Sequence, residues 1–282
     1  MSLRDILLQI DTYPDPTSSE AIDQAVRFAA SMGGTLSAVA VEVMIKAPNN
    51  RLANYLIGLG QLAREEEQKS RQFCVTALED FRVRAGAAGV LGDVIHLRDD
   101  VYDVGATVAQ RARTRDLCLV PVLDQYDGQR AVIEAVVFGA GRPVLTYRPG
   151  IADLPGAGPD LVVLAWDGTR TSARAMAGSL GVLQKARKVR VLTVTGEKPT
   201  ATAGLGEDAQ RHLVAHGVNA VVDEVDAGGR AIGRVFDDYL ERQGADLFVM
   251  GAYGRSRARE FILGGATEHM LKAPKVPLML SH

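Results

Sequence analysis

Three glycines near the C-terminus, Gly251, Gly254 and Gly264, have a spacing that suits binding of an anion by the backbone. They follow the apolar segment 246–250, which is typical of a strand. Because glycine has no Cβ, backbone N–H groups beside it can approach a bound anion closely. A helix after such a loop adds unpaired N–H groups and the positive end of its dipole. The local chemistry therefore suits a phosphate.

The glycine spacing differs from both common nucleotide-binding motifs. The Walker motif needs Gly-Lys-Ser/Thr after four intervening residues, and the dinucleotide motif reads G-x-G-x-x-G. The run is instead similar to the universal stress protein signature, which is glycine, two residues, glycine, nine residues, glycine, then Ser or Thr. Gly251, Gly254 and Gly264 match this signature in register. Gly265 stands where Ser or Thr is expected, and Thr267 falls where many members carry a second Ser.

The chain also contains a diverged internal repeat. Each half opens with a predicted strand, 5–10 or 161–166, followed by an aspartate, a polar turn and a helical pattern. The further predicted strands are 36–41, 93–97, 116–120 and 142–147 in the first half, and 189–194, 220–225, 246–250 and 276–280 in the second. Short apolar strands that alternate with amphipathic helices predict parallel sheets covered on both faces.

This repeated order of strands and helices predicts an α/β protein with two tandem, doubly wound domains, each with a parallel five-stranded sheet. The resemblance implies the Rossmann-like architecture of the adenine nucleotide alpha hydrolases. Segment 148–159 is rich in Pro and Gly and suits a linker, so we place the domains at 1–150 and 156–282. Pro121 occupies the place of Gly251 in the first domain and has no backbone N–H for an anion. The first domain is thus degenerate, because it lacks the glycine loop. We expect that it does not bind a nucleotide in the way predicted for the second domain.

Ligands of open α/β sheets bind beyond the carboxyl ends of the strands, where the strand order reverses. Asp167 ends the first strand of the second half, and we expect it beside the glycine loop. In the universal stress protein family, this aspartate and the residue two before it, here Ala165, line the adenosine pocket. A residue at the end of the second strand, here Val194, packs on the base. The resemblance thus implies a nucleotide site made of Ala165, Asp167, Val194, Gly251, Gly254, Gly264, Gly265 and Thr267.

These residues also have plainer interpretations. Asp167 suits an Asx turn or helix cap, a role compatible with ligand binding. Gly251 and Gly254 suit a tight turn, and Asp11, the first-half equivalent of Asp167, suits a turn residue retained from duplication. His212 and His216 have one-turn spacing, but no neighbouring residue completes a metal site, so we expect no metal centre.

Composition narrows the class of protein. The chain has 282 residues, a formal net charge of -2 and 47% hydrophobic residues. This charge balance favours neither nucleic acid nor an anionic membrane as a partner. The N-terminal residues lack a signal peptide pattern and no apolar run is long enough to span a bilayer, so we expect a cytoplasmic protein. Cys74 and Cys118 are expected to be reduced, structural thiols.

The resemblance implies a stress-response protein that binds ATP, or ADP or AMP, alone or with Mg²⁺, and acts through binding and assembly. It also implies that the two halves pack as an intrachain pseudo-dimer, with a homodimer as a further level of assembly. No pair of nucleophile and base is recognisable, and we assign no catalytic residue. Two alternatives stay open: a slow ATPase or phosphotransferase using the same site, and an interaction protein without nucleotide, which Gly265 favours.

Overall fold

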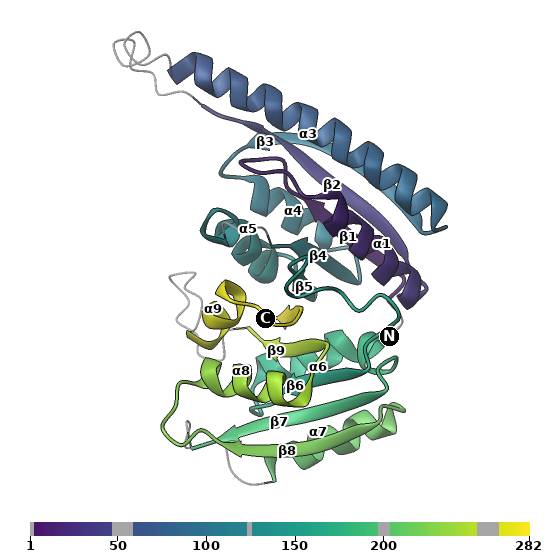
Figure 1. The fold of residues 1–282 in the computed structure, drawn as a ribbon, viewed down its shortest axis with the longest axis vertical. Helices are drawn as coiled ribbons and strands as arrows, with labels where there is room; N and C mark the ends of the chain where they lie inside the picture. Colours follow the sequence, from purple (N-terminus) through teal and green to yellow (C-terminus); the bar gives the residue numbers. More distant parts are fainter. Residues whose placement is uncertain (1–2, 47–58, 123–125, 197–203, 253–264) are drawn as a thin grey trace.

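The computed structural model describes residues 3–46, 59–122, 126–196, 204–252 and 265–282. The strands of the first half are β1 (Asp5–Ile10), β2 (Thr35–Met44), β3 (Leu91–Asp100), β4 (Leu117–Pro121) and β5 (Val144–Tyr147). Those of the second half are β6 (Leu161–Ala165), β7 (Lys188–Thr195), β8 (Ala220–Asp226), β9 (Leu247–Gly251) and β10 (Leu278–Ser281). Within the described residues, these ten strands form one sheet in the order β3-β2-β1-β4-β5-β10-β9-β6-β7-β8 (Figure 1).

Pairing is parallel within each half, as the sequence predicts. The two halves meet at β5 and β10, which pair antiparallel with Val144 opposite Leu280 and Thr146 opposite Leu278. Two parallel five-stranded sheets are therefore joined edge to edge into one. The division into domains 1–150 and 156–282 stays a prediction.

Helices cover both faces of this sheet, as expected for a doubly wound fold. One face carries α1 (Ser19–Met32), α3 (Leu59–Ala87), α6 (Arg170–Leu183) and α7 (Leu205–Ala215). The other carries α4 (Val104–Ala112), α5 (Tyr126–Gly139), α8 (Ile232–Gln243) and α9 (Gly265–Lys272). On β1, Ile6 and Leu8 join the first apolar layer and Leu7 the second. This alternation is the period of two that a strand requires, and both of its faces are buried.

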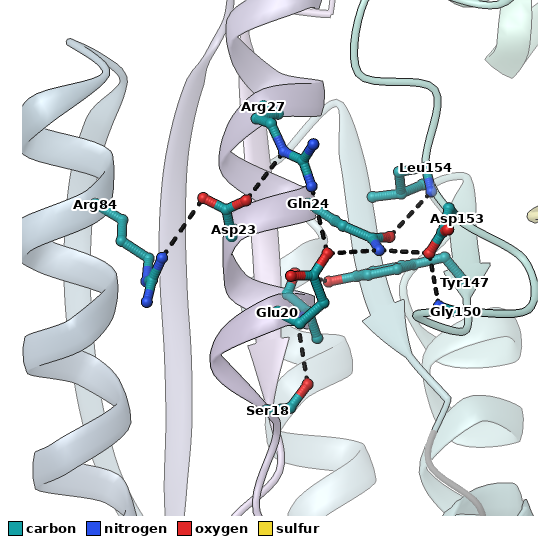
Figure 2. Close-up of polar contacts among 11 residues, drawn as sticks. Ser18, Glu20, Asp23, Gln24, Arg27, Arg84, Tyr147, Gly150, Asp153 and Leu154 are labelled. Atoms are coloured by element: carbon teal, nitrogen blue, oxygen red, sulfur yellow. Dashed lines mark hydrogen bonds and ion pairs between the residues drawn. The ribbon is translucent and has the colours of Figure 1, made fainter.

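The segment between the halves is held against the first half (Figure 2). At the end of β5, the hydroxyl of Tyr147 donates to the carbonyl oxygen of Ala21 on α1, at 2.7 Å. The buried amide of Gln24 donates to the Asp153 carboxylate and accepts from the backbone N–H of Leu154, at 3.1 Å. Segment 148–159 is therefore fixed to α1 by the hydrogen bonds of Asp153 and Leu154 with Gln24. The Pro and Gly content of the segment did not predict these contacts.

Candidate functional site

The second half contains the crevice where a doubly wound sheet binds its ligands. Its chain runs from β6 to β7 and β8 on one side, while β9 and β10 lie on the other, so the strand order reverses between β6 and β9. Asp167 follows the carboxyl end of β6 and Gly251 ends β9. The fold thus brings two of the predicted site residues to the switch point of one sheet.

Asp167 makes the Asx turn that its sequence position suggests. Its Oδ1 accepts from the backbone N–H of Thr169 at 3.1 Å and from the Thr169 hydroxyl at 2.6 Å. Thr169 is in turn the N-cap of α6, where its hydroxyl oxygen accepts from the Ser172 N–H. This arrangement fixes the half-buried carboxylate at the crevice. Its contact with a ligand stays a prediction.

Gly251 has a structural reason to be glycine. A Cβ at this position would lie 2.6 Å from the carbonyl carbon of Thr171 and 2.7 Å from the nitrogen of Ser172, both in the α6 backbone. Real Cβ atoms essentially never come this close, so the end of β9 can pack on the start of α6 only without a side chain. Its predicted contact with phosphate is untested. Gly254 and Gly264 lie outside the described residues.

Ala165 and Val194 lie on the face of the sheet that α9 covers. Both are half-buried and pack against the apolar layer to which Met270 and Leu271 of α9 belong. Their strands are neighbours, with Ala165 opposite Leu192 on β7. The structure therefore places these two predicted pocket residues and the helix after the glycine run in one layer.

Two predicted site residues, Gly265 and Thr267, lie in the first turn of α9 and differ in their exposure to solvent. Thr267 is buried, with 2% of its surface exposed. Gly265 is exposed, and a Cβ built on it would meet no atom of the described chain within 4 Å. A side chain at residue 265 therefore has room, so close packing in the described structure does not explain the glycine that departs from the signature.

A pair of side chains that the sequence analysis missed holds α9 to α8. His269 Nε2 and Asp237 Oδ2 share a hydrogen bond of 2.6 Å. Gly233 makes room for the imidazole, because a Cβ there would lie 2.5 Å from the His269 ring. Asp237 is buried, and its Oδ1 finds no partner among the described residues. These residues lie on different helices, so no local spacing in the sequence indicates their contact.

The histidine pair that the spacing does indicate is His212 and His216. Their ring centroids lie 4.6 Å apart on α7 and its C-cap. Within the described ranges, no three or more His, Cys, Asp or Glu side chains are grouped to hold a metal ion. The two imidazoles therefore show ring contact and nothing that identifies a metal site.

At the equivalent place in the first half, where β1 and β4 are neighbours, Asp11 is held by side chains of the protein itself. Asp11 is buried and accepts from the amides of Gln9, at 2.7 Å, and Gln129. Gln129, on α5, also donates to the carbonyl oxygen of Pro121, at 3.1 Å. Burial raises the pKa of Asp11 to about 6, although the two amide hydrogen bonds act in the opposite direction. Asp11 is thus part of a buried polar network, which goes beyond the turn role expected of it.

Solved structures resemble this arrangement over the whole chain. A universal stress protein from Archaeoglobus fulgidus superposes with a TM-score of 0.69, at 16% identity, over 98% of this chain and 95% of its own. The chain has the universal stress protein fold. A Pseudomonas aeruginosa protein described as a universal stress protein matches it with a TM-score of 0.55, at 16% identity, over 99% and 93% of the two chains.

A functionally unknown protein from Pseudomonas aeruginosa is also similar to the chain. Its TM-score is 0.53 at 14% identity, over 98% of this chain and 92% of its own. No protein-family sequence model and no curated protein matches the chain. The fold is therefore shown by structure alone. Among the helices in the described ranges, none combines the length and the apolar character needed to cross a bilayer.

Proposed function

We propose that this chain is a universal stress protein whose second half binds an adenine nucleotide, ATP or its products ADP and AMP, alone or with Mg²⁺. Its role is then regulatory, in a cytoplasmic stress response, and is exerted through binding and assembly. The observation that carries the proposal is the position of Asp167 and Gly251 at the carboxyl ends of β6 and β9. This is where the fold binds ligands, and the signature glycines predicted to hold phosphate follow directly after.

The contacts around these residues support a preformed site. Gly251 packs on the Thr171 backbone, and the hydroxyls of Thr171 and Thr169 lie 3.1 Å apart. Thr169 is bonded to Asp167, so a continuous series of contacts joins the two ends of the crevice. A ligand bound there therefore meets a carboxylate and a strand end whose relative positions are already set.

Two features of the first half argue that it binds no nucleotide, so that each chain binds one. Pro121 offers no N–H at the position of Gly251, and Gln9 and Gln129 each donate a hydrogen bond to Asp11. The proposal therefore assigns the nucleotide to the second half, where the signature glycines follow β9 in the sequence.

The first experiment combines mass spectrometry of small molecules released from freshly purified protein with calorimetric titration of ATP. Co-purified adenine nucleotide, or saturable binding of a single ATP, supports the proposal. A protein that is empty and does not bind ATP, ADP or AMP, with or without Mg²⁺, contradicts it. That outcome favours an interaction protein without nucleotide, the alternative that the glycine at residue 265 supports.

A matched pair of variants tests where the nucleotide binds. Asn preserves an Asx turn, so Asp167→Asn keeps the bond to Thr169 while removing the negative charge at the crevice. We expect the affinity for ATP to fall by roughly tenfold, the effect of one hydrogen bond to a charged group. Asp11→Asn makes the same change in the first half, away from the proposed site, and should lower the affinity much less than Asp167→Asn does. Equal effects of the two variants would contradict a site confined to the second half.

A further inference from the structure

Helix α9 takes polar partners from both halves of the chain. Figure 1 shows it between α8 of its own half and α5 of the other. His269 bonds to Asp237 on α8, and Glu268, the preceding residue, bonds to Arg130 on α5. The helix that carries Thr267 is therefore held from two directions.

The contact with the first half is an ion pair of intermediate exposure. Arg130 Nη1 lies 3.3 Å from Glu268 Oε1, and the two side chains are 30% and 29% exposed. Lys272, one turn further along α9, lies 3.0 Å from the same oxygen. Lys272 and, more weakly, Arg130 lower the pKa of the Glu268 carboxyl below its ordinary value. The carboxylate thus stays ionised at neutral pH and is shared by one cation from each half.

Arg130 is itself held in place by the structure of the first half. Its Nε lies 2.8 Å from Glu134, one turn along α5. The residue before it, Gln129, is buried and bonded to Asp11 and to the carbonyl oxygen of Pro121. The helix that carries Arg130 is therefore anchored to Asp11, after β1, and to Pro121, at the end of β4.

We infer that Arg130 is a positioning residue for the nucleotide site of the second half and acts through Glu268 on α9. The inference rests on the proposed function. It gives the first half a role: Asp11 and Pro121 hold α5 through Gln129, and α5 holds α9 through Arg130. If α9 is already held in place before the ligand binds, less of the binding free energy is lost in ordering the site.

Calorimetric titration of ATP into full-length variants tests this role. Arg130→Ala should weaken ATP binding by about threefold, because partly exposed ion pairs make small contributions. Arg130→Lys, which keeps a positive charge beside both Glu268 and Glu134, should keep the affinity near that of the parent protein. In 1 M NaCl, the difference between Arg130→Ala and the parent should disappear, because the Debye length falls to about 3 Å.

Arg27→Ala is the matched control, because Arg27 is a first-half arginine on α1 whose ion partners, Glu20 and Asp23, lie on the same helix. It should leave ATP affinity unchanged. Unchanged affinity in Arg130→Ala, equal loss in Arg27→Ala, or a loss in Arg130→Lys as large as that in Arg130→Ala each overturns the inference while the proposed function stands. A parent protein that binds no adenine nucleotide overturns both.

Discussion

Gln129 of α5 donates a hydrogen bond to the buried carboxylate of Asp11, a residue 118 positions earlier in the chain. The contact lies between β1 and β4, where the equivalent place in the second half carries Asp167 beside Gly251. Two copies of one fold thus differ in the partners of this aspartate. Asp11 accepts from two glutamine amides, and Asp167 accepts from the backbone N–H and the hydroxyl of Thr169.

The buried carboxyl makes folding stability depend on pH. Burial raises the pKa of Asp11 from 3.8 to about 6, so the folded chain binds more protons than the unfolded chain between these values. Stability from this group therefore rises as pH falls through the window. Asp11→Asn removes this titration. The free energy of unfolding of the variant minus that of the parent protein should therefore fall by roughly 2–3 kcal/mol from pH 7 to pH 4.

Urea unfolding of both proteins at several pH values measures this difference. Contributions from all other titrating groups cancel when the two free energies of unfolding are subtracted. A difference that does not change between pH 7 and pH 4 contradicts the raised pKa.

Gly265 offers a gain-of-function test of the nucleotide site. Gly265→Ser restores the hydroxyl of the signature at a position with room for a side chain. If phosphate binds at the start of α9, the new hydroxyl should strengthen ATP binding by roughly tenfold, as expected for a hydrogen bond to a charged group. Gly265→Ala is the control for the change in helix propensity and should not strengthen binding. Equal affinities of the Ser and Ala variants would place the phosphate elsewhere.

Gln24 should contribute to stability through the segment that follows β5. Gln24→Ala leaves the backbone N–H of Leu154 without its acceptor and removes one donor from Asp153. Because the amide is buried, we expect a loss of about 1–3 kcal/mol in the free energy of unfolding. Arg27→Ala, an exposed change on the same helix, should cost less than about 0.5 kcal/mol. Equal stabilities of the two variants in urea unfolding would show that the Gln24 contacts contribute little.

Cys74 and Cys118 should be unreactive in the folded protein. Both are free and buried, and burial raises their pKa values to about 11 and about 12. Because the thiolate is the reactive form, a disulfide reagent such as DTNB should not label either thiol at pH 8 until the chain unfolds. Rapid labelling of native protein would contradict this, and labelling in urea supplies the control for total thiol.

Much of the fold could be predicted from local patterns. An apolar run ending in an aspartate, a polar turn and a helical period recur at Asp11 and Asp167, and both lie at carboxyl ends of strands in the structure. Strand and helix periods reflect which faces are buried, and this information lies within short stretches of sequence. The resemblance alone assigned Ala165 and Val194 to the predicted pocket, and the structure places both in one apolar layer.

Only the tertiary structure decided how distant residues meet. The antiparallel pairing of β5 with β10, the Gln129 contact with Asp11 and the His269 contact with Asp237 each join separate elements. The reason that Gly251 must be glycine likewise lies in the α6 backbone against which it packs. The sequence by itself determined the repeat, the order of its strands and helices, and the glycine signature, because these depend on local period and spacing. The structure decided which residues bond to Asp11 and which helix is held from both halves, because those outcomes depend on packing between elements far apart in the chain.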